Sequence, residues 1–120
     1  MCFEIQIEET PDYLAARFIG AGTADEASRQ FESIAERCKR ANKNKLLLDF
    51  TEASGKISLA ERYFFAEKAL VFAQYRLKVA SVGAPEQIDP EGFGELVAQN
   101  RGVNIRAFTD VKSAREWLLK

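Results

Sequence analysis

The chain has 120 residues, a length that predicts one domain, residues 1–120, around a single core. Hydrophobic residues make up 47% of the sequence and charged residues 29%, a balance that argues against a disordered chain. The net charge of −1 lacks the excess of Lys and Arg that phosphate contacts require, so we expect no nucleic-acid binding. No apolar run approaches the ~20 residues of a membrane span.

The sequence contains no histidine, which removes the most common acid–base group and metal ligand near neutral pH. We therefore expect a protein that is not an enzyme and that holds no metal or cofactor. The two cysteines, Cys2 and Cys38, match no zinc motif and form no disulfide framework. They predict reduced thiols in a cytoplasmic protein without a signal peptide, with Cys38 buried on a helix.

Alternating apolar residues predict a half-buried strand over residues 3–8, and a second strand over residues 13–19 follows a Pro-Asp turn. The short connection between them predicts an antiparallel hairpin. Thr23 and Glu26 form a capping box, which predicts that a helix begins there. The buried face of that helix would carry Ala27, Phe31, Ile34 and Cys38.

Residues 46–50 form a short apolar run that is typical of a central strand covered on both faces. Ser58 and Glu61 make a second capping box, which predicts a helix from Ser58 to about residue 74. Both signals place a strand, a loop and a helix in succession in the middle of the chain.

Two more strand–helix pairs follow. The strands are expected over residues 77–82 and 105–108, and the helices begin at Asp89 and Asp110, which suit the N-cap position. The resulting order is β-β-α-β-α-β-α-β-α. It predicts an α/β fold with a four- to five-stranded mixed sheet, mostly parallel and covered by helices.

Five segments of the second half carry a family resemblance: LLLDF at 46–50, LKVA at 77–80, ELVAQNRGV at 95–103, RAFTD at 106–110 and WL at 117–118. In this order they resemble the SpoIIAA-like family of small bacterial proteins, which has the STAS fold of anti-sigma-factor antagonists. The order of elements extends the resemblance over nearly the whole chain. It implies a STAS-like domain with a regulatory, protein-binding role.

Ser58 occupies the position at which anti-sigma-factor antagonists carry a serine that a partner kinase phosphorylates. The Asp-Ser-Ser-Gly-like motif of those proteins is missing, because Ile57 precedes the serine and Leu59 follows it. Serine is also a leading N-cap residue, a role that stabilises a helix by about 1 kcal/mol. We expect capping to be the role of Ser58, with phosphorylation as the alternative.

The helix expected from Ser58 is apolar on more than one side. Leu59, Tyr63 and Leu70 fill the stripe that would face the sheet. The side chains left pointing sideways or outward are Phe64, Phe65, Val71 and Phe72. A contiguous apolar patch of this kind indicates an interface, unless neighbouring helices bury it within the same chain.

Two functions follow from this patch. The first is an interaction module that docks on a protein partner through the helix from Ser58, the partner being another protein or a second copy in a homodimer. The alternative is a binder of a small apolar ligand or lipid, in a pocket lined by the same phenylalanines.

Two charged groups are weaker candidates. A cationic cluster at residues 37–45 is typical of a helix C-terminus, where positive charges compensate the helix dipole. An anionic partner or membrane surface would also fit it. Asp49, Glu52 and Glu61 would lie near the carboxyl end of the central strand, where open α/β sheets bind ligands, but they lack a recognised metal-ligand spacing.

Overall fold

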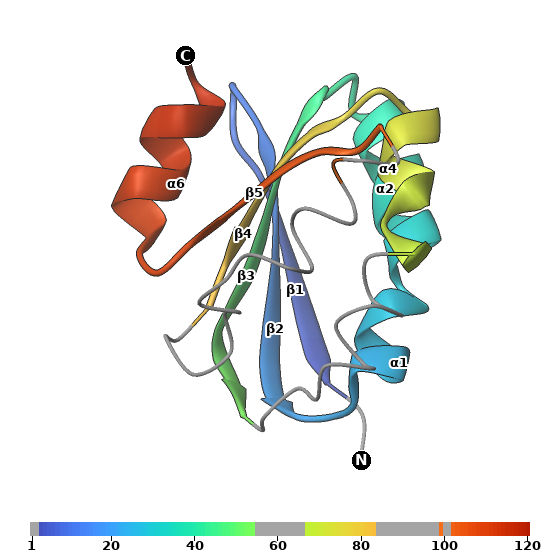
Figure 1. Cartoon of the computed structure of the whole chain (residues 1–120), viewed down its shortest axis with the longest axis vertical. Coiled ribbons are helices and arrows are strands. Elements are labelled where there is room, and N and C mark those ends of the chain that lie inside the picture. The colour runs from blue at the N-terminus through green and yellow to red at the C-terminus, as the bar shows by residue number, and fades with distance from the viewer. Residues whose placement is uncertain (1–2, 55–66, 84–98, 100–101) are drawn as a thin grey trace.

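The computed structural model describes residues 3–54, 67–83, 99 and 102–120, which form a five-stranded mixed sheet with helices on both faces (Figure 1). The strands are β1 (Glu4–Glu9), β2 (Leu14–Ala21), β3 (Lys45–Ser54), β4 (Lys78–Val82) and β5 (Asn104–Phe108). The helices are α1 (Ala24–Ser28), α2 (Phe31–Arg40), α4 (Leu70–Gln74) and α6 (Val111–Leu118). These elements confirm the predicted α/β class and the mixed sheet.

The strands lie in the order in which they occur along the chain, β1-β2-β3-β4-β5. β1 and β2 form the predicted antiparallel hairpin, and every later pair is parallel. β3 is the central strand, as the apolar run at residues 46–50 predicted. It continues to Ser54, four residues beyond that run.

Successive side chains of β3 point to opposite faces of the sheet and so build two apolar layers. Leu46 and Leu48 pack with residues of α1, α2 and α4 on one face. Leu47 packs with Ala114 and Leu118 of α6 on the other face. Figure 1 shows α6 on one side of the sheet and the other labelled helices, α1, α2 and α4, on the opposite side.

Phe72 lies in the core, so the expectation that its side chain points sideways or outward from the helix is wrong. Its side chain is fully buried, and its ring centroid lies 4.9 Å from that of Phe31 on α2. The physical reason is that α2 packs alongside α4 and covers the side of α4 that the sheet leaves open. Val71 is half-buried against the same core. Ser58, Phe64 and Phe65 lie outside the described residues.

The helix starts follow the capping signals. Thr23 Oγ1 accepts a hydrogen bond from Glu26 N at 3.1 Å, and Asp110 Oδ1 accepts one from Ser113 N at 2.7 Å. The single helix expected from Thr23 is divided into α1 and α2 at residues 29–30. None of the described helices has the length and apolar character needed to cross a membrane.

Helices α2 and α4 end in the same way, each with a non-glycine residue in the left-handed conformation. Asn42 has φ 58° and Arg76 has φ 57°. In each case the next residue donates a backbone hydrogen bond to the last turn, from Lys43 N to Cys38 O (2.8 Å) and from Leu77 N to Phe72 O (2.9 Å). These are Schellman motifs, in which glycine is the favoured residue. An arginine in this conformation costs about 1 kcal/mol.

Candidate functional site at the carboxyl end of the central strand

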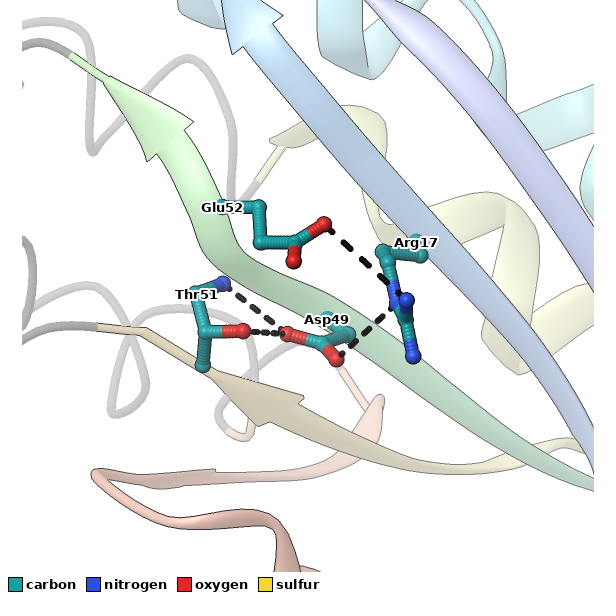
Figure 2. Close-up of polar contacts among 4 residues, drawn as sticks. All are labelled: Arg17, Asp49, Thr51 and Glu52. Carbon is teal, nitrogen blue, oxygen red and sulfur yellow. Dashed lines mark hydrogen bonds and ion pairs between the residues drawn. The ribbon is translucent and has the colours of Figure 1, made fainter.

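A β-bulge shapes the carboxyl end of β3. Arg17 of β2 pairs with Asp49 of β3. Two residues further along β2, Ile19 pairs with Glu52, which lies three residues beyond Asp49 on β3. Strict alternation would put residues 49 and 52 on opposite faces, because they are an odd number of positions apart. The extra residue in β3 cancels that alternation, so both carboxylates lie on the face of the sheet that carries Arg17 (Figure 2).

The guanidinium of Arg17 lies between the two carboxylates. Its Nε is 3.7 Å from Asp49 Oδ2, and its Nη1 is 3.9 Å from Glu52 Oε2. These separations are long for hydrogen bonds. The side chains of Arg17 and Glu52 are 47% and 54% exposed, so the pairs contribute at most about 1 kcal/mol to stability. Both groups therefore remain available to a partner.

Asp49 is the fixed point of this site. It is only 7% exposed, and its Oδ1 accepts hydrogen bonds from Thr51 N at 2.9 Å and from Thr51 Oγ1 at 2.6 Å (Figure 2). A buried carboxylate needs such donors to offset its desolvation. The two bonds orient Asp49 so that its second oxygen faces Arg17.

The strands beside this site carry further acidic side chains. α6 packs against β3, β4 and β5, whereas Arg17 lies on β2, next to Gln6 of β1 in the register. Glu4 and Glu8 flank Gln6 on the same face of β1, and both are exposed. Three exposed carboxylates, those of Glu4, Glu8 and Glu52, thus lie on the same face as one exposed guanidinium.

The sequence placed Asp49, Glu52 and Glu61 near this strand end. The structure brings Asp49 and Glu52 to one face, whereas Glu61 lies outside the described residues. Arg17 joins them, and sequence reasoning missed it because the register between β2 and β3 is a non-local property. Among the described residues, no group of three or more His, Cys, Asp or Glu side chains is placed to hold a metal ion.

Cys38 has no part in such a site. It is fully buried on α2, and burial raises the pKa of its thiol to about 11. The thiol is therefore protonated at neutral pH, whereas nucleophilic cysteines act as thiolates. Its buried position on a helix confirms the expectation from the sequence.

Comparison with known proteins identifies the fold. The chain is similar to the crystal structure of an uncharacterized protein from the DUF3478 family, with a SpoIIAA-like fold, from Shewanella loihica PV-4. The match covers 98% of this chain and 93% of that chain, with a TM-score of 0.56 and 26% sequence identity. The chain therefore has a SpoIIAA-like fold, which confirms the resemblance seen in its sequence. No protein-family model and no curated protein matches it.

Proposed function

We propose that the chain is a non-enzymatic, regulatory protein-interaction module of the STAS type that works in the bacterial cytoplasm. The observation that carries this proposal is the polar group at the carboxyl end of β3. It presents two half-exposed charges, Arg17 and Glu52, beside one buried carboxylate, Asp49, whose Oδ1 accepts two hydrogen bonds from Thr51. This arrangement suits recognition of a partner, because Asp49 is oriented before binding and the two exposed charges beside it are accessible.

The charge of this face of the sheet selects the partner. Glu4, Glu8 and Glu52 outnumber Arg17, so the surface attracts a protein with a basic patch. A two-fold pairing of this face with itself would bring together two surfaces of the same net negative charge, which is unfavourable. A different protein is therefore a better occupant than a second copy.

The docking surface continues, in this proposal, into the helix expected from Ser58. β3 ends at Ser54, so Ser58 follows the acidic face by four residues. Phe64 and Phe65 supply the apolar contact, and Glu52 belongs to the polar rim. Binding interfaces commonly combine an apolar centre with a charged rim of this kind.

The alternative function, binding of an apolar ligand or lipid, receives less support. It required a pocket lined by four side chains of the same helix. Two of them, Val71 and Phe72, pack instead against the core of the chain itself. The structure offers no separate observation in favour of this function.

Affinity capture from the native cell tests the proposal with three variants. Phe65→Glu changes the apolar contact, and Glu52→Lys changes the rim. Glu36→Lys makes the same charge change at an exposed position on α2, across the sheet, and is the control. We expect a protein with a basic patch that the wild type and the control capture equally and that both test variants lose.

Three other outcomes would overturn this proposal. A protein captured equally by all variants would place the contact elsewhere. A small apolar molecule found by native mass spectrometry, without a protein partner, would favour the alternative function. A dimer in sedimentation experiments that Phe65→Glu converts to a folded monomer would make the partner a second copy of the chain.

A further inference from the structure

A pocket of about 620 Å³ lies at the opposite edge of the sheet, where β3 and β4 begin. It is formed where α2 and α4 end side by side, at the two left-handed residues Asn42 and Arg76. Asn44 O accepts a hydrogen bond from Lys78 N at 2.9 Å, which ties the loop after α2 to the start of β4. The pocket therefore has a rigid base in the sheet.

The lining of this pocket is cationic. Lys39, Lys43 and Arg76 line it, and none of the described residues that line it is acidic. The side chains of Lys39 and Arg76 make no ion pair with the described residues, and Lys43 Nζ donates to the backbone oxygen of Pro11 at 3.1 Å. In a chain with a net charge of −1, three cations around one pocket are a local concentration of charge.

The positive charge extends along the same edge. Lys45 and Lys78 are register partners on β3 and β4. Burial lowers the pKa of Lys78, and the charges of Lys45 and Lys120 lower it further. The side chains of Lys45 and Lys78 point to the face that carries α6, where Lys78 Nζ donates to Trp117 O at 2.7 Å, so these lysines add positive charge near the pocket without lining it.

Arg76 is the residue that helix capping does not explain. Cations near a helix C-terminus compensate the helix dipole, and that accounts for a basic residue in the last turn. It does not account for an arginine at the one position of the motif where glycine is favoured. A residue kept in an unfavourable backbone conformation is a sign of function when the fold itself does not require its side chain.

We propose that this pocket binds the phosphate monoester group of an organic molecule. Three cations balance a dianion and leave a favourable excess, and phosphate oxygens accept the hydrogen bonds that Lys and Arg donate. The amide groups of Asn42, Asn44 and Gln74 supply further donors. The site is distinct from the protein-docking surface and lies at the other edge of the sheet.

The size of the pocket indicates that the ligand is larger than phosphate itself. Its volume falls within the range of organic-ligand pockets, about 300–1,000 Å³. Tyr75, which is half-buried, also lines it and offers an aromatic wall to the organic part. A soluble phosphate ester and a lipid with a phosphate monoester headgroup share this chemistry.

Titration of the ¹⁵N-labelled protein with phenyl phosphate tests the proposal. We expect saturable shifts of the backbone amides at residues 39–44 and 74–77, and none with phenol. Arg76→Gly is the decisive variant, because glycine suits the backbone there. It should weaken phenyl phosphate binding about tenfold or more, since a charge-assisted contact is lost, while the unfolding midpoint stays the same or rises.

The control is Arg115→Gln, which removes one positive charge from an exposed position on α6. It should bind phenyl phosphate like the wild type. Vesicles of phosphatidylcholine with and without phosphatidic acid identify a lipid source, since the phosphatidic acid vesicles alone should bind and Arg76→Gly should abolish that binding. Either source supports the proposal. It is overturned if neither probe binds, or if Arg115→Gln weakens binding as much as Arg76→Gly.

Discussion

Replacement of Phe72 by alanine measures whether this side chain belongs to the core or to an interface. The ring is fully buried within one chain, so its removal forfeits the transfer free energy of the ring and leaves a cavity. Buried Phe→Ala substitutions cost about 3–5 kcal/mol. A chain of this length has a free energy of unfolding of about 6–18 kcal/mol, so Phe72→Ala should remain folded with a large loss of stability.

The contact with Phe31 adds a second, independent measurement. The ring centroids lie 4.9 Å apart with an interplanar angle of 42°. Aromatic pairs at this distance contribute about 0.5–1.5 kcal/mol beyond the area that they bury. In a double-mutant cycle of Phe31→Ala and Phe72→Ala, we expect a coupling free energy of that size.

Urea unfolding is the assay, with Phe72→Leu as the conservative control and Phe72→Glu as the severe change. Phe72→Leu should lose much less stability than Phe72→Ala, because it leaves a smaller cavity. Phe72→Glu should fail to fold, because it buries a charge without a partner. The reasoning is refuted if Phe72→Ala costs less than about 1 kcal/mol while Phe72→Glu gives a folded protein, as expected of a surface residue.

Three further predictions concern single groups. The first uses a Cys2→Ser variant, in which Cys38 is the single cysteine. Because burial raises the pKa of Cys38 to about 11, we expect a thiol reagent to react with it at neutral pH only after denaturation. Rapid labelling of the folded protein would contradict this. The pKa of Asp110 is lowered from 3.8 by hydrogen bonds from the backbone and side chain of Ser113 and by the charge of Lys112. The wild type should therefore be more stable than Asp110→Asn at neutral pH. That difference in unfolding free energy should shrink below pH 3.8 and vanish once Asp110 is protonated in the folded protein; a difference that persists in strong acid would refute it. Arg76→Gly should raise the free energy of unfolding by about 1 kcal/mol, because it relieves the left-handed conformation of an arginine. Asn42→Gly should raise it by less, because asparagine tolerates that conformation. Thermal unfolding measures both effects, and equal effects would contradict the strain at Arg76.

Local sequence signals predicted the elements that depend on local physics. The alternation at the start of the chain predicted β1, and Thr23 and Asp110 predicted two helix starts through side-chain bonds to residues three positions later. Each of these features is decided by residues within one turn of structure.

The features that sequence reasoning missed depend on contacts between distant segments. Helical periodicity grouped Phe72 with outward-facing residues, but it carries no information on α2, which covers that side of α4. The bulge that joins Arg17 to Asp49 and Glu52 is a register offset between two strands, with no signal in either one. Arg76 was missed because sequence rules for helix ends look for glycine or asparagine.

The order of the strands also determines how the sheet can be assembled. Each strand pairs with the strand that precedes it in the chain, so no strand must be inserted between two others. During synthesis the β1–β2 hairpin can form first, and β3, β4 and β5 can add to its growing edge in turn. The apolar residues Leu47, Ala80 and Val82 acquire their cover from α6 only when residues 111–118 have left the ribosome. A chain that stops before Val111 would therefore lose the apolar contacts that α6 makes with this layer, which favours aggregation of truncated products.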